Sequence, residues 1–108
     1  FRFDDQLFRF GGEEFIALLQ PTTENFALAT LERFRKQVEK HPFWRVGKVT
    51  VSIGFSALRL DDSPSAAIDR ADEALYYAKR HGRNRVESYE RLLQSGQLQT
   101  RQPASAHA

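Results

Sequence analysis

Residues 9–15 read Arg9-Phe10-Gly11-Gly12-Glu13-Glu14-Phe15, with two glycines and two carboxylates set between apolar segments. Adjacent glycines between strand-like runs are typical of a hairpin, because glycine reaches the positive φ that tight turns need. Successive strand residues point to opposite faces, so Glu13 and Glu14 cannot both be buried in one core. The stretch therefore predicts a β-hairpin whose glycine turn leaves room for a ligand beside at least one carboxylate.

The acidic turn has two interpretations. A lone Gly-Gly hairpin with two acids is more often a solvated turn than a functional one. The alternative is a cation site, because Mg²⁺ prefers carboxylate oxygens and usually shares its coordination shell with substrate phosphates. Glu13 and Glu14 beside an open glycine turn suit that role.

Length and composition limit the class of protein. The 108 residues allow one domain, and 41% hydrophobic residues are enough to build a core. The 16 basic and 14 acidic side chains are too evenly balanced to indicate nucleic-acid binding. The sequence shows no apolar run of membrane-spanning length and no signal peptide, so we expect no membrane contact by this domain. The absence of cysteine excludes disulfides and thiolate zinc sites and is compatible with a reducing, cytoplasmic compartment.

The hairpin is predicted over residues 1–20, with strands at Leu7–Phe10 and Glu14–Leu19. Residues 15–19 form a continuous apolar run, which is typical of a central strand buried on both faces. Pro21 ends that strand, because proline has no N–H to donate to a sheet. Thr22 or Thr23 is the predicted N-cap of the helix that follows.

That first helix ends at His41-Pro42, since the residue before proline avoids the α region. Residues 49–56 alternate apolar and small polar side chains, the pattern of a strand, and residues 43–47 allow a short arm before it. A second helix starts with Ser63 as N-cap and Pro64 in its first turn. Its narrow stripe of small apolar residues would let it lie close to a sheet.

Gly82 is a suitable residue to end the second helix. Arg85–Tyr89 is the predicted last strand, and Leu92 and Leu93 allow one further helical turn. Residues 90–108 are predicted to be a polar, flexible tail. The order β-β-α-β-α-β predicts an α/β layered domain over residues 1–89.

Lys79 and Arg83 flank the end of the second helix. The simpler interpretation is that cations there interact favourably with the helix dipole and its last carbonyls. The alternative is a phosphate site, because a lysine charge and an arginine fork that reach one point would suit a polyphosphate.

Three segments together resemble one known family. Gly11-Gly12-Glu13-Glu14-Phe15, the strand at 49–54 and the segment Ala71–Lys79 with Gly82-Arg83-Asn84 resemble motifs of the GGDEF family of diguanylate cyclases, in the same order. The resemblance covers residues 1 to about 89. It implies a nucleotidyl-cyclase-like fold, with a central, mostly antiparallel sheet covered by helices and a hairpin that carries the turn.

Members of this family condense two GTP molecules into cyclic di-GMP and release pyrophosphate. By resemblance, Glu13 is the principal ligand of Mg²⁺ or Mn²⁺ and a candidate base, and Glu14 supports the metal or the substrate. Gly11 and Gly12 would admit the nucleotide, while Lys79 and Arg83 would bind its phosphates. Since one domain presents one GTP, the reaction implies a face-to-face homodimer.

The start of the chain resembles the family's Arg-x-x-Asp motif, which binds cyclic di-GMP and inhibits the enzyme. Arg2 and Asp5 match that motif at the usual distance before Gly11, and Arg33 falls where an auxiliary arginine would lie. An exposed ion pair of little energetic value is the simpler interpretation of Arg2 and Asp5 taken alone.

The family domain begins before residue 1, with a metal-binding Asp, guanine-reading residues and a central strand that this sequence lacks. We therefore expect these residues to be a truncated domain that is inactive alone. The parent protein is expected to be a cyclase, and any membrane anchor would lie in its N-terminal segments. A non-catalytic cyclic di-GMP receptor is the alternative function, although such relatives usually lose the Gly-Gly-acidic turn. An RNA-binding sheet is a more distant alternative. The carboxylates of Glu13 and Glu14 argue against it, since they would repel the phosphates of RNA.

Overall fold

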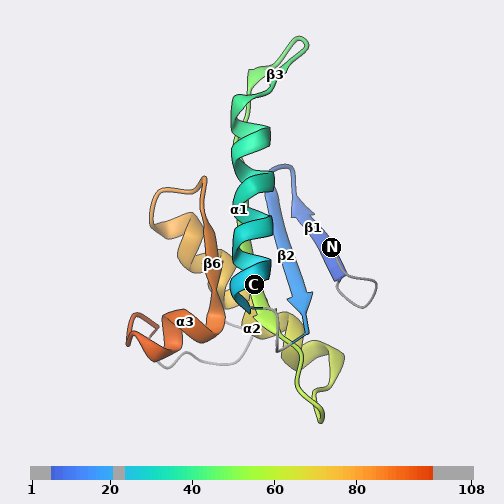
Figure 1. Ribbon diagram of the computed structural model, residues 1–108, viewed down its shortest axis with the longest axis vertical. Helices are drawn as coiled ribbons and strands as arrows, with labels where there is room; N and C mark the ends of the chain where they lie inside the picture. The colour runs from blue at the N-terminus through green and yellow to red at the C-terminus, as the bar shows by residue number, and fades with distance from the viewer. Residues whose placement is uncertain (1–5, 21–23, 99–108) are drawn as a thin grey trace.

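The computed structural model describes residues 6–20 and 24–98 of the chain (Figure 1). Six strands and three helices follow one another in this part. Their bounds are β1 Gln6–Gly11, β2 Glu14–Leu19, α1 Glu24–Lys40, β3 Pro42–Phe43, β4 Gly47–Lys48, β5 Ser52–Ala57, α2 Pro64–Arg80, β6 Val86–Ser88 and α3 Tyr89–Gln94. The predicted α/β architecture is confirmed. None of the described helices is long and apolar enough to cross a membrane.

The main sheet has the strand order β1-β2-β5-β6. β1 and β2 form the predicted antiparallel hairpin, whereas β2–β5 and β5–β6 are parallel. The expectation of a mostly antiparallel sheet is therefore wrong for the described residues. The reason is that α1 and α2 act as crossover helices, and each returns the chain to the same end of the sheet before the next strand starts.

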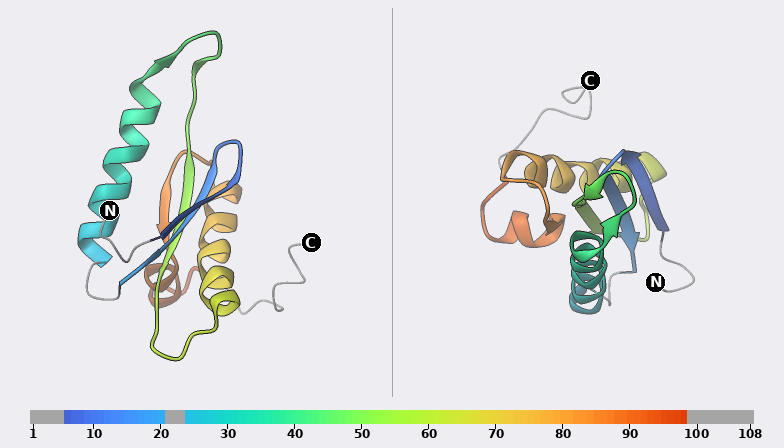
Figure 2. Two further views of the ribbon diagram at one scale, coloured as in Figure 1. Left: turned by 90° about the vertical axis from the view of Figure 1, so that its right-hand side faces the viewer. Right: turned by 90° about the horizontal axis from the view of Figure 1, so that it is seen from above.

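The two long helices cover opposite faces of this sheet (Figure 2). In β2, Ala17 and Leu19 pack in the cluster under α1, while Ile16 and Leu18 pack in the cluster under α2. All four are at most 5% exposed. The prediction of a central strand buried on both faces is confirmed, because each face of the sheet has its own helix.

Helix α2 lies unusually close to β5 at Gly54. A Cβ at this position would be 2.2 Å from the backbone nitrogen of Leu75 and 2.4 Å from the carbonyl oxygen of Ala71. Four alanines of α2 are fully buried against the sheet: Ala67, Ala71, Ala74 and Ala78. The small residues of α2 thus let the helix lie close to the sheet, as the sequence predicts. Ser63 caps the helix by accepting a hydrogen bond from the Ala66 N–H, also as predicted.

Other boundaries differ in detail. β3 and β4 form a small hairpin beyond the end of α1 (Figure 1), so the strand predicted from residue 49 starts only at Ser52. The predicted N-cap at Thr22 or Thr23 lies outside the described residues. Residues 90–94, which the sequence predicts to be part of the flexible tail, belong to α3, and Leu92 is 3% exposed. The helix packs against α2, β5 and β6, and burial of this leucine stabilises that packing.

Candidate functional site

Arg9 braces the glycine turn between β1 and β2. Its Nε donates to the carbonyl oxygens of Gly11 and Gly12 at 3.0 and 3.2 Å, and its Nη2 donates to the Gly12 oxygen at 2.8 Å. The sequence shows Arg9 only as a neighbour of the Gly-Gly-Glu-Glu turn and predicts no contact for it. The structure shows that its guanidinium binds two carbonyls of the turn and so fixes the turn to the start of the hairpin.

The two carboxylates of the turn face different surroundings. Glu13 is exposed and lines a pocket of about 610 Å³ that it shares with Arg9 and Gly12. The rest of that pocket is apolar, formed by Phe15, Phe34, Val38, Phe43, Val46, Val49 and Val51. Glu14 is half-buried on the α2 side. The alternation of strand residues separates the two groups, as the sequence predicted.

Lys79 and Arg83 converge on Glu14. The Lys79 Nζ lies 3.2 Å from Oε1 of Glu14, and Nη1 of Arg83 lies 3.4 Å from Oε2. Lys79 is in the last turn of α2, and Arg83 follows the Gly82 that ends the helix. The structure therefore places both cations at the acidic turn, with Glu14 rather than Glu13 as their direct partner.

The glycines of the turn have different environments. A Cβ at Gly11 would lie 3.1 Å from Oε1 of Glu14, so a side chain there would crowd the carboxylate. A Cβ at Gly12 would meet nothing within 4 Å. The surface over Gly12 is therefore open to a ligand, and the small size of Gly11 leaves Glu14 free to reach Lys79.

A divalent cation suits this donor set. Glu13 and Glu14 are adjacent in the sequence but face different surroundings, and Mg²⁺ is usually bound by one or two carboxylates plus water and substrate phosphates. Within residues 6–20 and 24–98, no group of three or more His, Cys, Asp or Glu side chains forms a metal cage. Either carboxylate would hold the ion only together with oxygens from a bound phosphate or from water.

Ser52 and Asn84 lie within the motifs that resemble the family, but the sequence predicts no role for either residue. The buried Ser52 donates its N–H to the carbonyl of Glu13 at 2.9 Å. The hydroxyl of Ser52 in turn accepts the N–H of Asn84 at 3.1 Å. The only sequence signal for them is their place within the strand motif and the Gly-Arg-Asn ending. Together they connect the acidic turn to the loop after α2.

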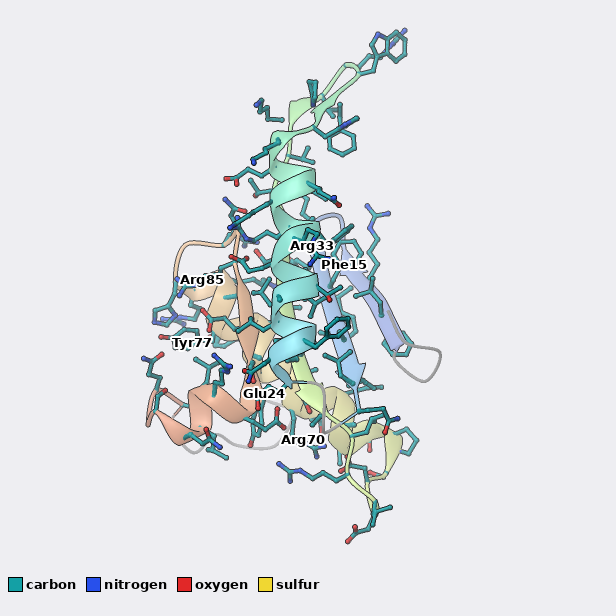
Figure 3. All side chains as sticks on the ribbon, in the orientation of Figure 1. Phe15, Glu24, Arg33, Arg70, Tyr77 and Arg85 are labelled. Carbon is teal, nitrogen blue, oxygen red and sulfur yellow. The ribbon has the colours of Figure 1, made fainter. Side chains whose placement is uncertain are left out.

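The proposed inhibitory residues are only partly described. Arg2 and Asp5 lie outside the described residues. Arg33 is exposed on α1, where Figure 3 shows it on the side of the helix near Phe15. Its position leaves it accessible to a ligand, and its relation to the Arg-x-x-Asp motif stays a prediction.

A second charged cluster lies at the other end of β5. Arg70 binds Asp62 with 2.6 Å between Nη2 and Oδ2, and this hydrogen bond lowers the pKa of Asp62 to about 2. Glu90 accepts the N–H of Ala57 with both oxygens at 3.3 Å, and burial raises the pKa of its carboxyl. These groups hold α2 and α3 to the end of the strand, away from the acidic turn.

Comparison with known proteins places this geometry in a family. The family model for the diguanylate cyclase GGDEF domain matches residues 1–85. Diguanylate cyclase A of Treponema denticola is 46% identical over 86 residues, covering 76% of this chain and 23% of that protein. Diguanylate cyclase DosC of Escherichia coli is 42% identical over 96 residues, covering 85% and 21%. The chain thus spans less than a quarter of the length of either relative.

A solved structure agrees with these matches. The GGDEF domain of DgcB from Caulobacter crescentus, in complex with c-di-GMP, has a TM-score of 0.57 and 38% sequence identity. The match covers 61% of this chain and 41% of that one. With the turn, the strand motif and the Lys-x-x-x-Arg spacing all in this region, the chain belongs to the GGDEF domain family of diguanylate cyclases.

Proposed function

We propose that the protein carrying this chain is a diguanylate cyclase that condenses two GTP molecules into cyclic di-GMP. The observation that supports this most strongly is the convergence of Lys79 and Arg83 on Glu14, beside the open glycine turn. Two cations and a carboxylate at one point form a site for a metal-bound triphosphate. The names of the relatives support the same reaction.

The residues of the site have distinct roles in this proposal. Lys79 and Arg83 exchange their contacts with Glu14 for contacts with phosphate oxygens, which bind arginine and lysine strongly. Gly12 lets the nucleotide approach the backbone, since no neighbouring atom fills the space above it. Glu13 and Glu14 would hold Mg²⁺ or Mn²⁺, which when bound activates a hydroxyl and stabilises charge on the phosphate.

The reaction joins two domains. The ribose 3′-oxygen of one GTP attacks the α-phosphorus of the other, a new phosphodiester bond forms, and the bond to pyrophosphate breaks. The hydroxyl proton passes to a base, for which the exposed Glu13 is the candidate. Two such steps close the ring, so two copies of the site face one another in a homodimer.

A cyclic di-GMP receptor without cyclase activity is the second candidate function. The GGDEF domain of DgcB was solved in complex with c-di-GMP, and Arg33 is exposed on α1 of this chain. Product binding at Arg2, Asp5 and Arg33 is compatible with either function. The intact acidic turn and its two cations favour the enzyme.

Incubation of the full-length protein with GTP and Mg²⁺ tests the proposal. We expect cyclic di-GMP and pyrophosphate to form, and chelation of the metal to stop the reaction. Lys79→Ala with Arg83→Ala should abolish product formation, while Lys48→Ala, an exposed lysine on β4, should not. Binding of cyclic di-GMP without turnover would support the receptor instead.

A further inference from the structure

The loop after α2 has an unusual backbone. Gly82, Arg83 and Asn84 have φ values of 112°, 60° and 49°, so three successive residues have positive φ. For a residue with a side chain, the left-handed region is sterically unfavourable. The Arg83 N–H bonds the carbonyl of Ala78 at 2.9 Å, which completes the helix end. Because this hydrogen bond does not involve Asn84, other contacts must stabilise the left-handed backbone of Asn84.

Asn84 has those contacts on two different elements. Its N–H donates to the buried Ser52 hydroxyl of β5 at 3.1 Å. Its Oδ1 accepts Nη1 of Arg35 and its Nδ2 donates to Oε2 of Glu39, both at 2.8 Å. Arg35 and Glu39 belong to α1, so one amide side chain joins the loop to the helix on the far side of the sheet.

Arg83 is held much less directly. Its side chain is 57% exposed, and the contact that the structure gives its guanidinium is Glu14 at 3.4 Å. An exposed arginine loses considerable side-chain entropy when it is held in one place. The direction of Arg83 therefore depends on its backbone, which the hydrogen bond from its own N–H to Ala78 restrains on one side and Asn84 on the other.

A ligand-binding role for Asn84 itself fits less well. The pocket that it lines, about 450 Å³, also contains Arg35, Arg83 and Arg85. Each of these cations is already paired with a carboxylate: Arg35 with Glu32 and Glu39, Arg83 with Glu14 and Arg85 with Glu87. Both polar atoms of the Asn84 side chain are likewise used within the protein.

We propose that Asn84 is a positioning residue, which holds the backbone of Arg83 so that its guanidinium meets the outer phosphates of the nucleotide. The proposal rests on the function proposed above. Asn84 touches no substrate. It acts through Arg83, and its own position is set by Ser52 on β5 and by Arg35 and Glu39 on α1.

Equilibrium titration of the full-length protein tests this role. The probe is 3′-deoxy-GTP with Mg²⁺, which lacks the attacking hydroxyl and cannot condense, and GMP serves as the comparison without outer phosphates. Asn84→Gly keeps the left-handed backbone accessible but removes the tether. It should weaken 3′-deoxy-GTP binding about tenfold, since the charge-assisted contact of Arg83 with the outer phosphates is only partly lost. Binding of GMP should change less than about twofold.

A paired substitution distinguishes positioning from general damage. Asn84→Asp places a carboxylate against Glu39 and should weaken 3′-deoxy-GTP binding. Adding Glu39→Gln restores a donor and an acceptor at this contact and should recover most of the affinity. Equal losses for both nucleotides, or no recovery in the double variant, would overturn the proposal.

Arg83→Ala separates this proposal from the function on which it depends. If Arg83→Ala weakens 3′-deoxy-GTP binding while Asn84→Gly does not, only the positioning role fails. If Arg83→Ala itself leaves the affinity unchanged, the phosphate site of the proposed function fails, and the positioning role fails with it.

Discussion

Lys79 lies against Glu14, with 3.2 Å between its Nζ and the Oε1 of the carboxylate, although 65 positions separate the two residues. Glu14 starts β2 and Lys79 lies in the last turn of α2, so the contact exists because α2 packs across β2 and β5. The cations of the candidate site are thus assembled before any ligand arrives. A preorganised site loses less entropy on binding than one that must form around its ligand.

The two carboxylates of the turn should respond differently to neutralisation. Glu14→Gln removes the partner of Lys79 and Arg83, but these pairs are partly exposed, so the free energy of unfolding should fall by no more than about 1 kcal/mol. Glu13→Gln should leave stability unchanged, because the described part of the chain gives its carboxylate no ion-pair partner. Chemical denaturation checks both values.

Metal-dependent activity should depend on both of these carboxylates. Each substitution should reduce the Mg²⁺-dependent rate more than about tenfold, since a bound metal contributes several kcal/mol of charge stabilisation. Asp61→Asn, at an exposed acid in the loop before α2, is the control and should keep the rate. A wild-type rate in Glu13→Gln would remove Glu13 from the proposed metal site.

Gly54 should tolerate no side chain. Gly54→Ala would place a methyl group 2.2 Å from the backbone of Leu75, and α2 would have to move away from β5. We expect the free energy of unfolding to fall by about 1–3 kcal/mol or more, the usual cost of overpacking a core. The matched control is Gly12→Ala, which meets no atom within 4 Å and should change stability by less than about 0.5 kcal/mol. Equal urea midpoints for the two variants would contradict the close packing.

Glu90 should make stability depend on pH. Burial raises the pKa of its carboxyl above the ordinary 4.5, so the folded chain keeps the proton at a pH where the unfolded chain has lost it. The stability from this group is complete below pH 4.5 and is lost as the pH rises through the folded-state pKa. Glu90→Gln has no such loss, so its stability relative to wild type should increase from pH 4.5 upward. Thermal unfolding across that range measures the difference, and a constant difference would contradict it.

Arg33 and Arg2 should affect cyclic di-GMP binding and not folding. Either substitution to alanine should weaken the affinity about tenfold, the equivalent of about 1.4 kcal/mol from one lost charge-assisted contact. The melting temperature should stay the same for Arg33→Ala, because the side chain is exposed. Calorimetric titration measures the affinity, with Arg45→Ala on the β3–β4 hairpin as the control. Unchanged titrations for both variants would remove the inhibitory site.

Local patterns predicted most of the elements. Three predictions came from neighbouring residues alone: the buried strand from the apolar run at 15–19, the start of α2 from Ser63-Pro64, and its close packing from the alanine stripe. The direction of β5 relative to β2 was missed. The resemblance implied a mostly antiparallel sheet, whereas the helical crossover between β2 and β5 makes these two strands parallel.

The sequence alone determined that a glycine turn carries two carboxylates with opposite directions, because the period of a strand is a property of neighbouring residues. It also determined that a lysine and an arginine flank the end of α2. Only the tertiary structure decided that Glu14 is the carboxylate they meet, and that Asn84 ties their loop to Ser52, Arg35 and Glu39. Those contacts join residues far apart in the chain, and they depend on how closely α2 lies on the sheet at Gly54.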